Sequence, residues 1–436
     1  MVRAVIVAGA VALALAAQPA PTVEVAHLGL GSEFGAPVVG SDGGAWVPID
    51  RSAAEYDRGE SDPDDALGRA MPDGTFRVAA VDGRLSPTGA VLGPDGQAWF
   101  PVGLSIDRFD AAGNLTRSEL PQPLGDVAAT GPDGTLWSAD ARAGRLLRVN
   151  AQGAVTSARL KLPACEARSF FQAMQTAADG AVWIADGGCS RMIRLAPDGT
   201  AAVHELADDE RPLTLAPDRA GGIWFSGDSI QTRVGHIDAA GMIHRWPTPE
   251  RYGPARAIAV GPDGTAHLAF ARCVLGRIAP GRPLGFAAAP IPVRHLAFDP
   301  GGGLWLASAS RLVHAPSSTL SRGMCDDKPP AVRLSPALRR SVRLARLRRG
   351  IRISVREPAT ISATGDYGND DHDWRLRIVR VKAGGSLVFR LPRGQLKRYE
   401  RLLAAGRRPE ISLYVQAYDR DGNIGQVEQE AIPVTR

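Results

Sequence analysis

The sequence predicts an all-β protein, a seven-bladed β-propeller followed by a C-terminal β-sandwich of the immunoglobulin-like or fibronectin-III-like kind. Three observations lead to this fold class. A turn-and-aromatic motif occurs seven times, a strand-like segment precedes the first copy, and about 105 residues after the last copy alternate without the motif. We place the propeller at residues 21–325, a linker at 326–331 and the sandwich at 332–436.

The repeat consists of a turn related to Gly-Pro-Asp-Gly and then an aromatic residue inside a short apolar run. The aromatic positions are Trp46, Trp99, Trp137, Trp183, Trp224, His267 and Trp305. They are 38 to 53 residues apart, which is the range of a four-stranded propeller blade. We therefore interpret the turns and aromatics as structural, serving turn formation and packing between sheets.

The seventh copy has no clear fourth strand of its own. Residues 22–28 alternate like a strand but precede the first copy. We expect this N-terminal strand to complete the seventh blade, because that pairing would close the ring and remove an exposed sheet edge.

The 436-residue chain has 44% hydrophobic and 22% charged residues, which are ordinary values for a globular protein. Its two regions differ in net charge. Residues 328–436 hold 23 Lys and Arg against 11 Asp and Glu, a net charge of +12. The preceding residues hold 28 against 35, a net charge of −7. The first 20 residues have the pattern of a signal peptide, so we expect an exported protein, extracellular or in the cell envelope, periplasmic if an outer membrane exists, without a transmembrane segment.

Four cysteines in an exported protein favour two disulfides over free thiols. Cys165 and Cys189 flank the fourth aromatic at one end of its blade, and Cys273 and Cys325 stand near the end of the ring. We predict the pairs Cys165–Cys189 and Cys273–Cys325, although the sequence leaves other pairings open.

Residues 131–140, GPDGTLWSAD, and residues 275–278, LGRI, together with the sevenfold count and the closing strand, resemble the virginiamycin B lyase family of seven-bladed propellers. The resemblance covers about residues 22–320. It implies a lyase that opens an ester-closed antibiotic ring with magnesium, histidines and glutamates. The positions matching the histidines hold Arg256 and Arg294, and those matching the glutamates hold Pro292 and Ala309. His295 is displaced by one residue, which turns a strand side chain to the opposite face.

An arginine cannot act as a general base or bind magnesium. We therefore expect a binding protein without a cofactor, with magnesium needed only if a lyase-like activity exists. A metal-assisted carbon–oxygen lyase and a purely adhesive surface protein are the alternatives.

The starts of the inner strands offer an anion site instead. Three successive blades are expected to present Arg211, Arg256 and Arg294 to the central channel, while Asp126, Asp140 and Asp186 lie across the ring. Converging guanidinium groups suit capture of carboxylate, phosphate or sulfate, but each arginine could instead pair with an acid of a neighbouring blade. An acidic insertion at residues 55–65 would lie at the same end.

The C-terminal region has strand-like runs at 351–356, 375–381, 386–391 and 411–418, a turn at 419–423 and a helical segment at 394–405. Six arginines between 339 and 349 could bind a polyanion or form a solvated edge. We expect a monomer whose partner is an anionic small molecule or a cell-envelope polymer, and no specific nucleic-acid binding.

Overall fold

The computed structural model describes the chain from residue 22 to its end, with gaps. It covers residues 22–28, 32–50, 65–81, 90–93, 96–102, 104–110, 112–131, 133–150, 152–165, 167–208, 210–228, 233–271, 273–316, 331–334, 341–356, 358–366, 374–375, 379–381, 385–391, 393–418 and 424–436. The predicted signal peptide, Cys325, the turn at 419–423, all but the last residue of the predicted linker and all but the last residue of the acidic insertion lie outside these ranges.

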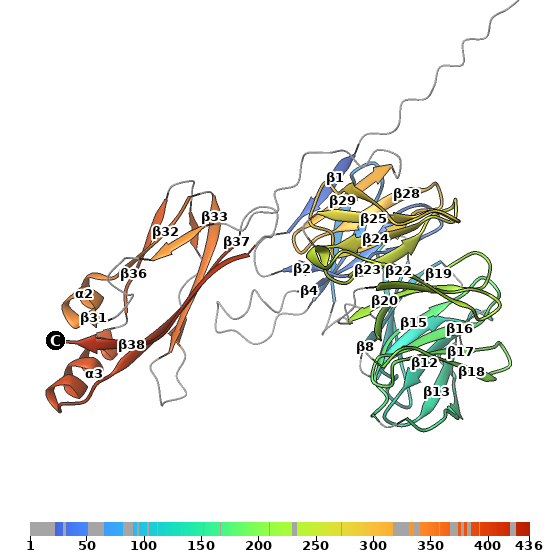
Figure 1. Ribbon diagram of the computed structural model, residues 1–436, viewed down its shortest axis with the longest axis horizontal. Coiled ribbons are helices and arrows are strands. Elements are labelled where there is room, and N and C mark those ends of the chain that lie inside the picture. Colours follow the sequence, from blue (N-terminus) through green and yellow to red (C-terminus); the bar gives the residue numbers. More distant parts are fainter. Residues whose placement is uncertain are drawn as a thin grey trace, which may run out of the picture.

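Residues 23–316 form a series of antiparallel sheets in which consecutive strands pair in sequence order (Figure 1). In the first sheet β4 (Ala45–Asp50) pairs with β5 (Ala66–Ala70) and with the short strands β2 (Glu33–Phe34) and β3 (Val38–Val39), and β5 pairs with β6 (Phe76–Ala80). The second sheet contains β7 (Val91–Leu92), β8 (Ala98–Val102), β9 (Ser105–Phe109) and β10 (Leu115–Glu119). The third contains β11 (Val127–Thr130), β12 (Leu136–Asp140), β13 (Arg145–Val149) and β14 (Val155–Arg159).

The same order continues along the chain. The fourth sheet contains β15 (Phe171–Thr176), β16 (Val182–Asp186), β17 (Arg191–Leu195) and β18 (Ala201–Glu205), and the fifth β19 (Arg211–Pro217), β20 (Ile223–Asp228), β21 (Arg233–Ile237) and β22 (Ile243–Pro247). A 3-10 turn, η1 (Glu250–Tyr252), leads to the sixth sheet, β23 (Ala257–Val260), β24 (Ala266–Phe270), β25 (Val274–Ile278) and β26 (Gly285–Ala288). The last contains β27 (His295–Phe298), β28 (Gly303–Ala307) and β29 (Arg311–Pro316).

The N-terminal strand β1 (Val23–His27) completes this last sheet. It pairs antiparallel with β29, with Val23 opposite His314. The side chain of Arg311 also donates a hydrogen bond of 2.7 Å to Glu24. The predicted pairing of the N-terminal segment with the last repeat is therefore confirmed.

The first strands of the sheets lie side by side. β3 contacts β7, and the sequence of neighbours continues through β11, β15, β19 and β23 to β27, which contacts β3 again. We call these the inner strands. Repeated four-stranded antiparallel sheets of this kind are those of a β-propeller.

The motif turns and the aromatics have the structural roles that the sequence predicts. Gly134 and Gly264 close their turns at φ of 73° and 78°, a conformation that costs glycine little and other residues more. Trp46, Trp99, Trp137, Trp183 and Trp305 are each no more than 1% exposed and fill the spaces between sheets.

Each motif tryptophan is covered by a cationic or imidazole side chain from the third strand of its own sheet, a feature that we did not predict. Arg69, Arg108 and Arg148 place their guanidinium carbons 4.7, 4.3 and 4.0 Å from the ring centres of Trp46, Trp99 and Trp137. His236 and His314 lie with ring centres 4.5 and 4.6 Å from those of Trp224 and Trp305.

In several sheets the aspartate of the motif turn holds this covering side chain. Asp42 binds Arg69, and Asp179 binds Arg194. His236 lies 2.6 Å from Asp218, and His314 lies 2.7 Å from Asp299. We call the combination of turn aspartate, covering side chain and aromatic the blade clamp, because it fixes the first turn of a sheet to its third strand.

The sixth sheet departs from the other sheets, because His267 replaces tryptophan. His267 is 1% exposed, lies opposite Arg277 and has its ring centre 5.0 Å from that of Phe298. Burial, and to a smaller extent the charge of Arg277, lowers the pKa of His267 to about 4. The imidazole is therefore neutral in the folded protein over most of the pH range.

Residues 331–436 form two further sheets around one core. One contains β30 (Val332–Leu334), β32 (Ile351–Val355) and β36 (Ser386–Phe389). The other contains β31 (Val342–Arg343), β33 (Ala359–Asp366), β34 (Trp374–Arg375), β35 (Val379–Val381), β37 (Glu410–Tyr418) and β38 (Ile424–Thr435). Both sheets supply buried apolar side chains to the same cluster, including Ile353, Phe389, Ile361 and Val415.

Two helices belong to this C-terminal part, α2 (Leu344–Arg349) and α3 (Arg393–Ala404). The helix predicted at 394–405 is thus confirmed, whereas the end of the arginine-rich run at 339–349 is helical and not a strand edge. No helix in the part of the chain that the structure describes combines the length and apolar character needed to cross a membrane.

The buried tryptophans should carry much of the stability of the sheets. Trp183→Ala is expected to lower the free energy of unfolding by about 3–5 kcal/mol, because it removes a large side chain from a closely packed space. Leu115→Ala, at an exposed position of an outer strand, should change it by less than about 0.5 kcal/mol. Denaturant unfolding of both variants measures this, and equal losses would contradict the assigned role of the motif aromatic.

His267 predicts a specific pH dependence of stability. Because its pKa is about 4 in the folded protein and about 6.5 in an unfolded chain, the unfolded state binds this proton first as the pH falls. Stability should therefore decline between pH 6.5 and 4, by up to roughly 3 kcal/mol from this group. His267→Phe should reduce the decline in melting temperature over this range. Parallel curves for the two proteins would show that protonation of His267 has no such cost.

Candidate functional site

The candidate site lies at the end of the sheets where the inner strands begin, which we call the inner-strand end. Arg256 and Arg294 each precede an inner strand, β23 and β27. Their backbone N–H groups donate to the carbonyls of Ala269 and Ala307, in both cases at 2.8 Å. They therefore occupy the same register position on neighbouring strands, as the sequence predicts.

The two arginines differ in their partners. Arg294 forms an ion pair of 2.6 Å with Glu33 on β2, so the last repeat and the first are joined by a charge pair. The side chain of Arg256 is exposed and forms no hydrogen bond or ion pair with the residues that the structure describes. Glu33 thus pairs with one of these two arginines, while the side chain of the other has no such partner among the described residues.

Glu33 was not identified from the sequence. A signal was present, because Glu33 lies between the predicted closing strand at residues 22–28 and the first motif turn, where the inner strand of the first repeat is expected. Its proximity to Arg294 depends on ring closure, which brings together residues 261 positions apart.

Arg211 does not share the register position of the other two arginines. In the fifth sheet Thr214 lies opposite Ser226, as Ala257 lies opposite Ala269 in the sixth, so Leu213 is the residue equivalent to Arg256. Arg211 begins β19 two residues before Leu213, and a register shift between Pro212 and Thr214 places Arg211 opposite Asp228. The side chain of Arg211 is exposed.

The three aspartates predicted across the ring bind groups of their own sheets. Asp126 accepts a hydrogen bond from the N–H of Ala141 at 3.0 Å. Asp140 pairs with Arg145 at 3.3 Å, and Asp186 pairs with Arg191 at 3.0 Å. Each carboxylate therefore stabilises the local loop or hairpin that contains it.

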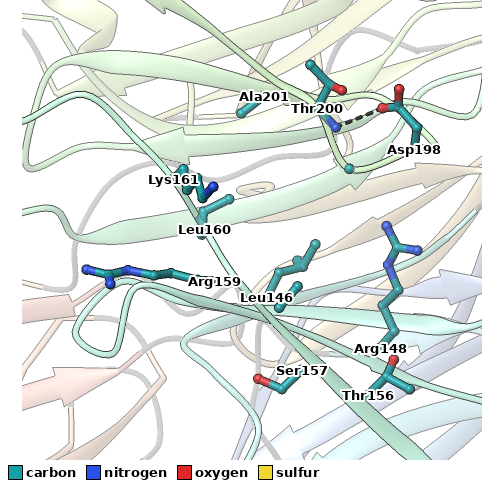
Figure 2. Close-up of a pocket in the computed structure, with 12 residues that line it drawn as sticks. Leu146, Arg148, Thr156, Ser157, Arg159, Leu160, Lys161, Asp198, Thr200 and Ala201 are labelled. Atoms are coloured by element: carbon teal, nitrogen blue, oxygen red, sulfur yellow. Dashed lines mark hydrogen bonds between the residues drawn. The ribbon is translucent and has the colours of Figure 1, made fainter.

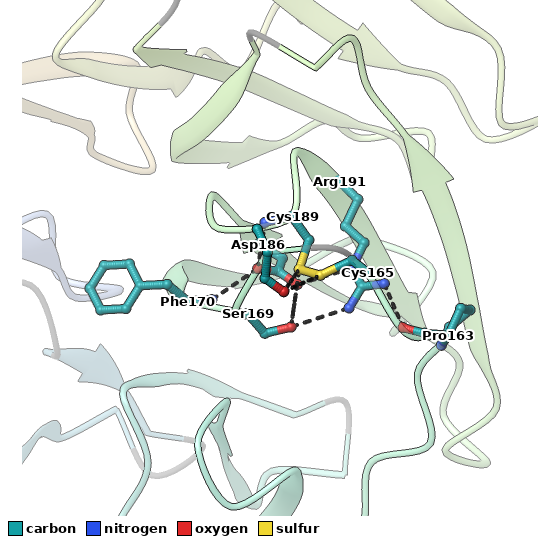
Figure 3. The surroundings of a disulfide bond; sticks show 8 residues. Pro163, Cys165, Ser169, Phe170, Asp186, Cys189 and Arg191 are labelled. Atoms are coloured by element: carbon teal, nitrogen blue, oxygen red, sulfur yellow. Dashed lines mark hydrogen bonds and ion pairs between the residues drawn. A yellow bond between two sulfur atoms is a disulfide. The ribbon is translucent and has the colours of Figure 1, made fainter.

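Asp186 belongs to a buried cluster beside a disulfide (Figure 3). Its carboxylate is 0% exposed and accepts hydrogen bonds from the Ser169 hydroxyl at 2.9 Å and the Phe170 N–H at 3.0 Å. Arg191 also donates to the carbonyl of Pro163. A buried pair with this many hydrogen bonds keeps its charges compensated and leaves little freedom to bind a ligand.

The predicted disulfide Cys165–Cys189 is confirmed, with 6.0 Å between the Cα atoms. It ties the segment before β15 to the loop after β16 at the inner-strand end (Figure 3). Cys273 is disulfide-bonded as well. Its predicted partner Cys325 lies outside the described residues.

The residues present do not fit a magnesium ion of the kind the family resemblance implies. The matching positions hold two guanidinium groups, Pro292 and Ala309, none of which supplies a side-chain ligand, and no cluster of three or more His, Cys, Asp or Glu side chains occurs within the described ranges. Burial and the neighbouring Arg294 lower the pKa of His295 to about 4, so its imidazole is neutral beside that guanidinium.

A separate groove of about 430 Å³ lies between the outer strand of the third sheet and the turn at residues 198–201 of the fourth (Figure 2). Its apolar lining includes Leu146 and Leu160, and Arg148 and Lys161 provide positive charge. Arg148 also covers Trp137. This groove was not predicted from the sequence.

The repeated sheets define the N-terminal part of the chain as a β-propeller. The profile of the virginiamycin B lyase family matches residues 60–284. The virginiamycin B lyase of Nocardia farcinica is 32% identical over 207 residues, which span 46% of this chain and 68% of that protein. The chain belongs to the virginiamycin B lyase family, which confirms the resemblance seen in the sequence.

Two solved structures illustrate the range of similar folds. Virginiamycin B lyase from Staphylococcus aureus has a TM-score of 0.54 at 17% identity, covering 67% of this chain and 98% of that one. The extracellular domain of BT4673 from B. thetaiotaomicron has a TM-score of 0.51 at 13% identity, covering 95% of this chain and 58% of that one. At these identities the similarity concerns the fold alone.

Proposed function

We propose that this protein is an exported, non-catalytic binding protein, a seven-bladed propeller with an immunoglobulin-like C-terminal module, that recognises an anionic group at its inner-strand end. The boundaries are those expected from the sequence, 21–325 and 332–436. The circular order of inner-strand contacts and the pairing of β1 with β29 support the propeller. The shared core of two sheets supports the module.

Arg256 beside the Arg294–Glu33 pair is the observation that carries the binding proposal. Arg256 and Arg294 stand at the starts of adjacent inner strands, and Glu33 compensates the charge of Arg294. Repulsion between two nearby cations is reduced when a ligand brings a second negative charge. A planar guanidinium can bind carboxylate, phosphate or sulfate through two parallel hydrogen bonds.

A location outside the cytoplasm agrees with several features. The Cys165–Cys189 disulfide is typical of an oxidising compartment. The extracellular domain of BT4673 has a similar fold. We therefore propose that the protein acts at the cell surface or in the cell envelope.

Catalysis is the second candidate function, because the Nocardia farcinica relative is a virginiamycin B lyase by name. The residues at the positions that match the family's histidines, Arg256 and Arg294, argue against catalysis. Arginine remains protonated at all relevant pH values and cannot remove a proton from a substrate. A purely adhesive protein with an inert inner-strand end is the third candidate.

The binding proposal predicts that Arg256→Met combined with Arg294→Met abolishes stabilisation by small anions. Citrate, phosphate and sulfate are the probes, and the increase in melting temperature at millimolar concentration is the measurement. Glu33→Gln should instead strengthen binding, because it removes the internal carboxylate that competes for Arg294. Arg282→Met is a matched control, since Arg282 is an exposed arginine in the turn between β25 and β26 at the opposite end of the same sheet.

The proposal fails if no anion stabilises the wild-type protein while the double variant melts several degrees lower. In that case the arginines serve the fold, and the Arg294–Glu33 pair is a structural link between the last and first repeats. Equal effects of Arg282→Met and the double variant would likewise reject a localised site.

Catalysis is tested separately. The purified protein should not linearise streptogramin B antibiotics in magnesium buffer, with the Nocardia farcinica enzyme as the positive control. Mass spectrometry detects the opened ring directly. Turnover above background that a chelator abolishes would establish the lyase and overturn the non-catalytic assignment.

A further inference from the structure

The two helices of the C-terminal module carry a concentration of positive charge that the site above does not use. α2 and α3 lie with β31 and the end of the chain at one end of this module (Figure 1). β31 pairs with the last strand, and Arg343 lies opposite Thr435. We call this region the basic end; its exposed cationic residues are Arg343, Arg346, Arg348, Arg349, Arg393, Lys397, Arg401, Arg407, Arg408 and Arg436.

Helix α3 is divided into an apolar and a cationic face. Leu396, Tyr399 and Leu403 pack against the module core. Arg393, Lys397 and Arg401 are exposed at intervals of four residues, so they form one row along the helix with steps of about 6 Å. We call these three residues the α3 row.

Few of the side chains that the structure describes in this module are acidic. Among the module side chains that the structure describes, the acids are Glu400 and Glu410. Glu400 already pairs with Arg348 of α2. The three side chains of the α3 row form no hydrogen bond or ion pair with the described residues. Such a surface attracts anions strongly at low and moderate ionic strength.

The geometry points to a linear polymer with a repeating phosphate backbone, and we propose that the α3 row docks the protein on such a polymer of the cell envelope. Regular cation spacing along a straight helix matches charges repeated along a chain. Arginine-rich surfaces favour phosphate because of its bidentate geometry. The choice of an envelope polymer rests on the proposed export, whereas the charge row itself does not.

Two other polyanions fit less well. Inserting a helix into a lipid surface requires exposed large apolar side chains, and Val388, 37% exposed, is the one found among the described module residues. Unspecific single-strand nucleic-acid sites rely on exposed aromatic rings for base stacking, but Tyr399 of α3 is 3% exposed. The described part of the basic end provides positive charge without a set of exposed large apolar side chains or an exposed aromatic ring for stacking.

The test uses the full chain and synthetic poly(glycerol phosphate) labelled for fluorescence anisotropy. The triple variant Arg393→Gln, Lys397→Gln, Arg401→Gln should weaken binding at least about tenfold at 50 mM salt. It should also reduce the slope of log K against log salt concentration by about 2, since three phosphate contacts are lost. The melting temperature should remain that of the wild type, because all three side chains are exposed.

A second triple variant keeps the same change in net charge while sparing the α3 row. It carries Arg282→Gln, Arg333→Gln and Arg356→Gln, at exposed positions in a propeller turn and near the far end of β32. Its affinity should stay within about twofold of the wild type. Equal losses in the two triple variants would show that net charge alone acts and would overturn the proposal.

Vesicles containing phosphatidylglycerol and a single-stranded DNA of arbitrary sequence complete the comparison at equal phosphate concentration. We expect both to bind more weakly than the polymer. Tighter binding to vesicles or to DNA, or no binding to the polymer at 50 mM salt, would overturn the proposal. The α3-row triple variant should lose polymer affinity by the same factor whether or not Arg256→Met and Arg294→Met are also present, so failure here is distinguishable from failure of the anion site.

Discussion

The blade clamp is the interaction on which the architecture of the propeller depends. In sheet after sheet a buried aromatic on the second strand is covered by a cation or imidazole on the third, and in several sheets the turn aspartate fixes that cover. Cation–π contacts contribute about 0.5–2 kcal/mol each, increasing with desolvation. Repetition around the ring makes the sum large, and it keeps the tryptophans close-packed between neighbouring sheets. Where the motif departs from this pattern, as at His267 opposite Arg277, the stability of the fold depends on pH.

Where it occurs, the clamp lies at the motif-turn end of its sheet, which leaves the other end free to vary. The inner-strand end is held by a different set of contacts, among them the Asp186–Arg191 cluster, the Cys165–Cys189 disulfide and the Arg294–Glu33 pair. These contacts differ from sheet to sheet. The fold can therefore be kept while the side chains at this end vary from sheet to sheet.

The local features of the fold were predictable from the sequence, whereas the partners of the site residues were not. The turns, the strand order and the closing strand follow from short motifs, because a turn and its flanking strands are contiguous in the chain. The pairing of Arg211 with Asp228 depends on a strand register shift near Pro212, which no sequence motif indicates. Glu33 meets Arg294 only through ring closure. Asp126, Asp140 and Asp186 bind groups of their own sheets, and these local partners were not predicted from the sequence.

The distribution of arginine between the two parts of the chain has a physical meaning that composition alone does not supply. In the propeller many arginines are used internally, as covers of tryptophans such as Arg108 and Arg148 or as partners of buried acids such as Arg191. Their charge is therefore largely compensated within the fold. In the C-terminal module the exposed cations of α3 lie on the face opposite its apolar contacts, and the described acids are few. Packing does not require charge at those positions, and mutual repulsion opposes it. A solvent-facing row whose charges have no partner among the described residues is best explained by a negatively charged partner outside the chain.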